Sequence, residues 1–197
     1  MYAHFSGKLA YKSPTLVVVD CNGVGYELHI SLYTFERLKN TDQITLLAHL
    51  VVKEDGHVLY GFADEEERSL FRHLISVNGI GAATARMILS SLSAHELQHA
   101  ILQGNVSLLK SVKGVGPKSA QRIILELQDK LQKSEAGEIR FPGSGSRTSQ
   151  RDEAVTALVA LGFTRPQIEK AVGAVMAQSS TSPVNVEDII KQALKRL

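Results

Sequence analysis

Several kinds of residue and segment are scarce in this chain of 197 residues, and each scarcity excludes a class of protein. Cys21 is the only cysteine, so neither an internal disulfide nor a zinc cluster of cysteines can form within one chain. No apolar run approaches the roughly 18–20 residues of a membrane span. Residues 1–8 lack the charged stretch followed by an apolar one that a secretory signal requires. We therefore expect a cytoplasmic protein that does not bind membranes.

Aromatic residues and net charge are also low. Tryptophan is absent, aromatic residues make up 6% of the chain, and the formal net charge is +2. This balance differs from that of a protein that coats nucleic acid through charge alone. A nucleic-acid site in this chain must concentrate its positive groups on one face or rely on neutral hydrogen-bond donors.

The first part of the chain, residues 1–63, has the pattern of short strands. The β-branched run at 15–19 is followed by the turn pair Asn22-Gly23, and Asp55-Gly56 joins two further strand candidates at 43–52 and 57–62. Short strands with glycine-bearing turns predict a small antiparallel barrel or sandwich.

The rest of the chain is predicted to be helical, which makes the fold class α+β and multidomain. Asp64 starts a helical region at 64–134, in which Ser93 and Glu96 form a capping box and Gly104 ends a helix. A stretch rich in Gly and Ser at 135–150 predicts a flexible linker. Residues 151–197 predict three short helices, with the first ended by Gly162 and the other two capped by Thr164 and Asn185.

One segment of the helical region occurs twice. VNGIGAATA, residues 77–85, matches VKGVGPKSA, residues 112–120, at a shift of 35 positions. The match continues into the flanking helices, where Leu74 meets Leu109 and Ile88 meets Ile123. The chain therefore contains a duplicated helix–hairpin–helix unit.

The duplicated turn has the chemistry of an anion site. Its two glycines permit positive φ and remove the Cβ atoms that block close approach. A helix begins directly afterwards, so its first N–H groups point outward without intrahelical partners at the positive end of the dipole. Phosphate is the natural ligand of such a turn. A dinucleotide fingerprint and a P-loop both fail here, because Thr84 or Ser119 replaces the third glycine and Pro117 precedes Lys118.

Two such turns on one chain suit the two strands of a duplex, and they position a protein without reading bases. The second copy carries more positive charge, including Lys110, so we expect it to contribute more of the salt-dependent affinity. The predicted DNA-binding residues are Asn78, Gly79, Gly81, Thr84 and Arg86 in the first copy, and Lys113, Gly114, Gly116, Lys118, Ser119 and Arg122 in the second.

The order of motifs along the whole chain resembles the RuvA family, the Holliday-junction recognition subunits of the bacterial branch-migration motor. The segments that carry the resemblance are GVGYE at 23–27, VVKEDGHVLYGF at 51–62, ERSLF at 67–71, the two hairpins, and ALVALGF at 157–163. It implies an OB-like barrel at 1–63, a tandem helix–hairpin–helix domain at 64–134, and a three-helix bundle of ubiquitin-associated (UBA-like) type at 151–197.

The resemblance also implies a function and partners. The expected protein is a non-catalytic homotetramer without cofactor or metal that holds four-way junction DNA open in recombination and repair. Glu54 and Asp55 would form an acidic pin at the crossover, and Lys53 would hold a nearby phosphate. Leu161 and Phe163 would contact a RuvB-type motor ATPase. A junction resolvase is a further expected partner, and the resemblance leaves open whether one tetramer or an octamer encloses the junction.

Three other interpretations remain open at this point. A generic DNA-binding repair accessory protein would bind duplex and junction alike. An enzyme, either a zinc hydrolase or a nuclease, is the second. The zinc hydrolase is suggested by H-E-x-x-H at 95–99, although Glu96 also caps a helix and no third ligand follows at the expected spacing. A purely structural adaptor would show no salt-dependent DNA binding.

Overall fold

The chain is described by a computed structural model that covers residues 2–38, 42–54, 56–135, 150–178 and 185–197. It divides into two compact units, Met1–Ala136 and Gly137–Leu197. Most of the predicted flexible linker, 135–150, lies outside the described residues, so that prediction stays untested.

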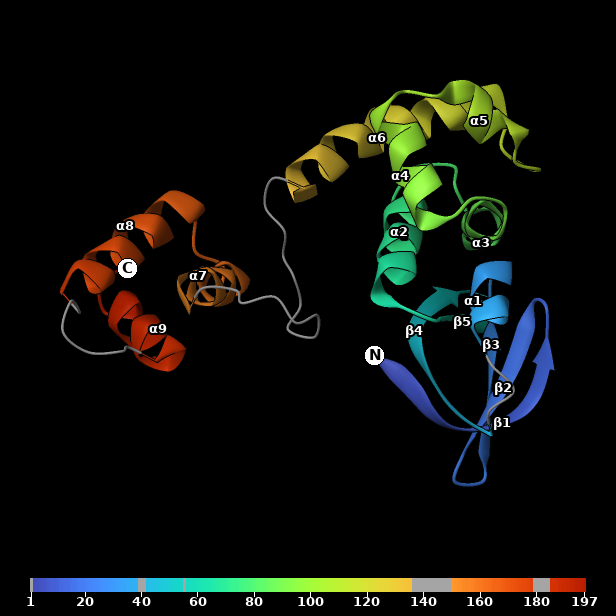
Figure 1. The fold of residues 1–197 in the computed structure, drawn as a ribbon, viewed down its shortest axis with the longest axis horizontal. Helices are drawn as coiled ribbons and strands as arrows, with labels where there is room; N and C mark the ends of the chain where they lie inside the picture. The colour runs from blue at the N-terminus through green and yellow to red at the C-terminus, as the bar shows by residue number, and fades with distance from the viewer. Residues whose placement is uncertain (1, 39–41, 55, 136–149, 179–184) are drawn as a thin grey trace. The chain divides into compact units, whose positions relative to one another are not determined.

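The first unit begins with five strands, with one helix between the third and the fourth, and continues with helices (Figure 1). In chain order its elements are β1 (His4–Ser13), β2 (Leu16–Cys21), β3 (Val24–His29), α1 (Leu32–Arg37), β4 (Gln43–Lys53), β5 (Gly56–Phe62), α2 (Glu65–Ile75), α3 (Ala82–Ser91), α4 (Ala94–Leu102), α5 (Val106–Ser111) and α6 (Pro117–Glu135).

The five strands close a barrel in the order β1-β2-β3-β5-β4, which confirms the OB-like barrel. Four of the pairs are antiparallel. The fifth pair, β3 with β5, is parallel, with Leu28 opposite Leu59 and His29 opposite Tyr60. This parallel pair differs from the antiparallel sheet that the turn signals suggested, because α1 and β4 intervene and return the chain in the same direction.

Strand β1 and helix α1 are two elements that no sequence pattern specifically predicted. Strand β1 pairs with both β2 and β4, so it is needed to close the barrel. A Cβ atom at its Gly7 would lie 2.1 Å from the carbonyl oxygen of Asp20, so only glycine permits this approach of β1 to β2. Inside the barrel, alternation of β2 buries Val17 and Val19 completely.

Two helices of the first unit begin where their capping residues predict. The Asp64 carboxylate accepts a hydrogen bond from the backbone N–H of Glu67, 2.9 Å away, at the start of α2. Ser93 and Glu96 form the complete capping box of α4. Gly104, at φ +66°, follows the end of α4.

The barrel and the helices share a core and a buried polar cluster. Phe71 of α2 is fully buried, with its ring centroid 4.9 Å from those of Tyr60 and Phe62 of β5. Glu67, only 2% exposed, accepts hydrogen bonds from the hydroxyls of Ser31 and Thr34 beside the barrel. These contacts join barrel and helices into one unit, so the predicted boundary at 63/64 stays a prediction.

The second unit is a bundle of three helices, α7 (Gln150–Ala160), α8 (Arg165–Gln178) and α9 (Val186–Leu194). Its core includes Leu158, Ile168, Val172 and Ile189, all fully buried. Gly162, at φ +94°, follows α7 as predicted. Asn185 is the N-cap residue of α9, but its side chain makes no capping hydrogen bond.

Candidate nucleic-acid interface

The two predicted hairpins have the same internal geometry. In the first, which joins α2 to α3, the N–H of Ile80 donates to the carbonyl of Val77 at 3.0 Å. In the second, which joins α5 to α6, the N–H of Val115 donates to the carbonyl of Val112 at 3.1 Å. We call residues 76–81 turn 1 and residues 111–116 turn 2.

The duplicated positions also match in burial. Val77 and Ile80 are buried in turn 1, as are Val112 and Val115 in turn 2. The remaining pairs of buried counterparts are Leu74 and Leu109, Ala85 and Ala120, and Ile88 and Ile123. Asn78, Gly79 and Gly81 are exposed, as are their counterparts Lys113, Gly114 and Gly116, so each turn presents its backbone to solvent.

The two glycines of each turn differ in backbone conformation. Gly79 and Gly114 have φ of +87° and +89°, the left-handed region that favours glycine. Gly81 is the N-cap of α3 at φ −82° and ψ 164°, a conformation open to any residue. The φ of Gly116 is not positive either. Of the two glycines that permit positive φ in each turn, only the first adopts it.

The second glycines leave space and free donors instead. A Cβ atom built on Gly81 or Gly116 would meet no protein atom within 4 Å. Gly81 makes no side-chain cap to the first N–H groups of α3. A helix start with open space and uncapped amides is the geometry that anions occupy.

The predicted cations of the second hairpin lie around turn 2. Lys113 and Lys118 are exposed beside Gly114 and Gly116, and Ser119 is partly exposed. Arg122 lies one helical turn further along α6, and its Nη1 donates to the carbonyl oxygen of Asn78 in turn 1, 3.0 Å away. No sequence pattern predicted this link between the hairpins.

The first hairpin has fewer free cations at its turn. Thr84 is partly exposed in the first turn of α3. Arg86 contacts the barrel: its Nη1 donates to the carbonyl of Thr15 at 2.9 Å and lies 3.3 Å from Nδ1 of His29. Burial and the Arg86 charge lower the pKa of His29 below its ordinary value, so the neutral imidazole is favoured there. The guanidinium of Arg86 therefore joins α3 to the barrel.

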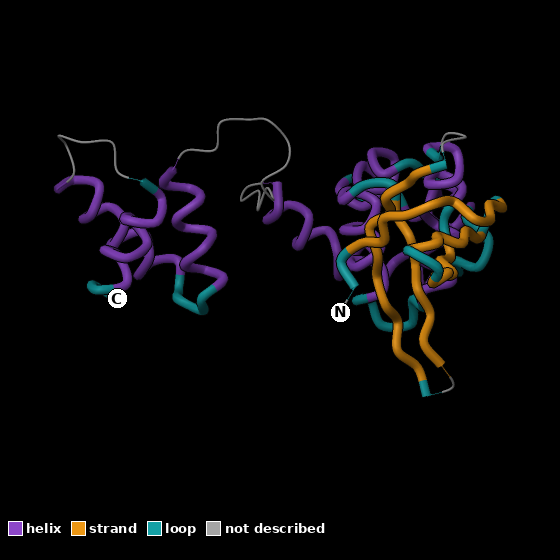
Figure 2. Tube along the Cα trace, turned by 90° about the horizontal axis from the view of Figure 1, so that it is seen from below, coloured by secondary structure: helices purple, strands orange, loops and turns teal. Residues whose placement is uncertain are grey.

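The predicted acidic pin lies at the end of a two-stranded ribbon. Lys53 ends β4 and pairs with Gly56 of β5, and Lys53 and Glu54 are both exposed. Figure 2 shows the far ends of β4 and β5 extending together beyond the neighbouring helices. Asp55, the second predicted pin residue, lies outside the described residues. Val51 and Val58, which face each other as a cross-strand pair of this ribbon, pack against the helical core.

Comparison with known proteins agrees with this arrangement. A family model described as the RuvA N-terminal domain matches residues 1–61, one for a SAM-like helix–hairpin–helix tandem matches 71–129, and one for the RuvA C-terminal domain matches 149–197. The curated relative from Flavobacterium psychrophilum, named Holliday junction branch migration complex subunit RuvA, is 48% identical over 198 residues and all of both chains.

This chain belongs to the RuvA family. Two further relatives of the same name, from Christiangramia forsetii and Cytophaga hutchinsonii, are 47% and 46% identical. The match covers all of both chains for the first and 99% of both chains for the second. The resemblance seen in the motif order is thereby confirmed over the full length.

The H-E-x-x-H segment of this RuvA-family chain lies on α4. The rings of His95 and His99 stack with centroids 6.4 Å apart. Glu96 accepts hydrogen bonds from the backbone N–H and the hydroxyl of Ser93, which hold the pKa of its carboxyl below its ordinary value. Glu96 thus serves as a helix cap. Among the described residues, no three His, Cys, Asp or Glu side chains cluster in a way that could hold a metal ion.

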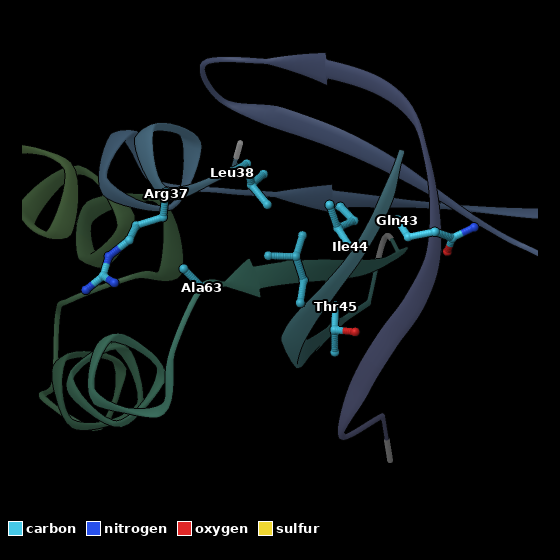
Figure 3. Close-up of a pocket in the computed structure, with 7 residues that line it drawn as sticks. Arg37, Leu38, Gln43, Ile44, Thr45 and Ala63 are labelled. Atoms are coloured by element: carbon cyan, nitrogen blue, oxygen red, sulfur yellow. The ribbon is translucent and has the colours of Figure 1, made fainter. Parts of the chain in front are cut away.

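A cavity of about 300 Å³ lies on the barrel, between α1 and β4 (Figure 3). Arg37, Ile44 and Thr45 are among its lining residues, and none of the predicted site residues lines it. Within the described residues, no helix is long and apolar enough to cross a membrane.

The two residues of the second unit predicted to contact a partner differ in exposure. Leu161 is 60% exposed in the turn between α7 and α8. Phe163 is partly buried and packs against the core of the bundle. Leu161 is therefore available to another protein, whereas much of the Phe163 ring stabilises the bundle.

Proposed function

We propose that this chain is the Holliday junction-binding subunit of a DNA branch-migration complex, acting in recombination and repair. The observation that carries the proposal is the pair of equivalent turns, each with a left-handed glycine, open space at the second glycine, and a helix start directly behind it. The names of the full-length relatives supply the identity of the DNA.

In this mechanism the two turns bind phosphates of one duplex arm. The N–H groups at the starts of α3 and α6 donate to phosphate oxygens, and the helix dipoles favour the negative charge. Lys113 and Lys118, exposed at turn 2, add charge there, with Thr84 and Ser119 as neutral donors. These contacts involve only the DNA backbone, so they carry no sequence preference.

The pin supplies the preference for junctions over continuous duplex. Carboxylates of Glu54 and Asp55 repel phosphates, by roughly 1 kcal/mol at 4 Å in water and about 4 kcal/mol where the effective dielectric constant is near 20. A continuous duplex lying across the pin meets this repulsion, whereas the four arms of a junction pass around it. Lys53, exposed beside Glu54, holds a neighbouring phosphate.

The proposed assembly and partners are those that the resemblance to the RuvA family implies. A homotetramer brings four pins to the centre of a junction, and a second tetramer on the opposite face would give an octamer. The second unit recruits a RuvB-type motor ATPase through a surface that includes Leu161. The chain itself is non-catalytic, because the motor performs the ATP hydrolysis, and a junction resolvase completes the set of partners.

A competition experiment tests the proposal. Labelled four-way junction is bound to the full chain and displaced by unlabelled junction or by unlabelled duplex of equal length, at several salt concentrations. We expect junction to compete far better than duplex, and affinity to fall with salt as phosphate contacts require. Equal competition would leave a generic DNA-binding protein as the function. Light scattering with and without junction measures the number of subunits bound.

A further inference from the structure

One face of helix α6 is directed at the other hairpin. Arg122, Glu126 and Lys130 follow at intervals of four, so they share a face of the helix. Arg122 donates to the carbonyl of Asn78 at 3.0 Å, and Lys130 Nζ donates to the hydroxyl of Ser76 at 3.3 Å. Both acceptors belong to turn 1, whereas α6 belongs to the second hairpin.

The duplication does not explain these contacts. At a shift of 35, the counterparts of the three α6 residues in α3 and α4 are Met87, Ser91 and His95. Met87, the counterpart of Arg122, is exposed and uncharged. The contact runs one way only, from the helix of the second hairpin to the turn of the first.

The guanidinium of Arg122 lies directly against turn 1. A Cβ atom at Gly79, the left-handed glycine of that turn, would lie 3.7 Å from Arg122 Nη1. On its other side, Arg122 Nε lies 3.9 Å from the Glu126 carboxylate, which keeps the side chain directed along the helix. The forked guanidinium therefore contacts the turn and the helix at once.

We propose that Arg122, supported by Glu126 and Lys130, is a positioning residue that fixes turn 1 relative to turn 2. This inference rests on the proposed binding of both turns to one DNA arm. Two turns held at a fixed separation bind DNA more strongly than two turns that move independently, because less conformational entropy is lost on binding. Arg122 thus acts through the backbone of turn 1, in place of the direct phosphate contact that its charge first suggested.

Two variants, each of which introduces the residue at the equivalent position of the first copy, distinguish positioning of turn 1 from direct phosphate contact. Arg122→Met introduces the residue found at position 87, and Lys118→Ala introduces the residue found at position 83. Arg122 is about half exposed, at 51%, and Lys118 is exposed, so neither change opens a cavity in the core. Lys130→Met removes the second link to turn 1 without altering Arg122.

Hydrogen exchange of the free full-length protein measures the positioning directly. We expect the amides of residues 76–81 to exchange about fivefold faster in Arg122→Met, the effect of losing one hydrogen bond, while those of the barrel strands are unchanged. Lys130→Met is expected to act in the same direction, and Lys118→Ala to leave turn 1 unchanged. Wild-type exchange at 76–81 in both Arg122→Met and Lys130→Met would overturn the proposal.

Salt-dependent junction binding provides the second measurement. We expect Arg122→Met to weaken binding several-fold with an unchanged salt slope, and Lys118→Ala to reduce the slope by about 0.9, the value for one lost phosphate contact. In a Gly79→Ala background, in which turn 1 is already strained, Arg122→Met should add little. A reduced slope or a fully additive effect would make Arg122 a phosphate ligand and overturn the proposal. If wild-type protein does not prefer junction over duplex, the proposed function fails, while the exchange result still decides the role of Arg122.

Discussion

The glycines of the two turns allow the effects of substitution on stability and on DNA binding to be separated. Alanine at Gly79 or Gly114 must adopt φ near +90°, which costs about 1–2 kcal/mol per residue. Neither Cβ would clash, since the one neighbour is Arg122 Nη1, 3.7 Å from Gly79. We therefore expect each variant to melt lower by about 2–8 °C, using roughly 2–4 °C per kcal/mol.

Alanine at Gly81 or Gly116 should behave differently. Gly81 has ordinary extended φ and ψ, and the added Cβ of either residue meets no protein atom within 4 Å. We expect the unfolding free energy to change by less than about 1 kcal/mol, since a weaker N-cap is offset by a less flexible unfolded chain. Junction affinity should nevertheless fall about tenfold or more, because the Cβ displaces charge-assisted N–H to phosphate bonds of about 1.5–3 kcal/mol each.

Gly104 provides the matched control for this series. It has φ +66° and open space around its Cβ position, but it lies between α4 and α5, away from both turns. Gly104→Ala should lower the melting temperature like Gly79→Ala and leave junction affinity unchanged. Thermal denaturation and fluorescence anisotropy with labelled junction give the two quantities. Wild-type junction affinity in the double variant Gly81→Ala, Gly116→Ala would refute close approach of DNA to the turns.

Three further predictions concern the pin, a buried carboxyl and the second unit. Glu54→Gln with Asp55→Asn should reduce the preference for junction over duplex by about tenfold while junction binding remains, as measured by competition. Burial raises the pKa of Glu67, against hydrogen bonds from its neighbours, so the stability it contributes is present below the unfolded pKa near 4.3 and is lost as pH rises through the folded pKa. The unfolding free energy of wild type relative to Glu67→Gln should therefore fall as pH rises from about 4 in denaturant titrations, and a constant or growing difference would contradict this. Leu161→Ser should weaken binding to a RuvB-type ATPase without lowering the melting temperature, whereas Phe163→Ser should lower the melting temperature. Calorimetry measures both the ATPase binding and the melting temperature. Undiminished ATPase binding by Leu161→Ser would show that Leu161 is not part of the interface.

The hairpins could be predicted from sequence because their determinants are local. Each turn lies within a few residues of its glycines, and the same pattern occurs twice, at 77–85 and 112–120. The capping residues Asp64 and Ser93 act within three positions of themselves, and both form the expected bonds. The local pattern could not show which glycine of each turn adopts positive φ. Glycine is also favourable at an N-cap position, where it leaves open space and positive φ is not required.

Contacts between distant segments were beyond the reach of such patterns. Arg122 bonds a carbonyl 44 residues away and Arg86 one 71 residues away, so the helical position of each arginine did not reveal its partner. Strand β1 has a weak local signal, because Gly7 and neighbouring polar residues interrupt its alternation, and it is fixed by pairing with β2 and β4. The parallel pairing of β5 with β3 likewise depends on closure of the whole barrel.

The packing of Val51 and Val58 against the helical core limits how far the β4–β5 ribbon can move relative to the two turns. The β4–β5 ribbon and the buried residues of both turns belong to one hydrophobic core. Under the proposed function, a single subunit therefore holds the pin and the two DNA-binding turns at a fixed separation. Identical subunits arranged around an axis would repeat the same distance between pin and turns on every arm of a junction. The core packing of each subunit would therefore determine the spacing that distinguishes a junction from a continuous duplex.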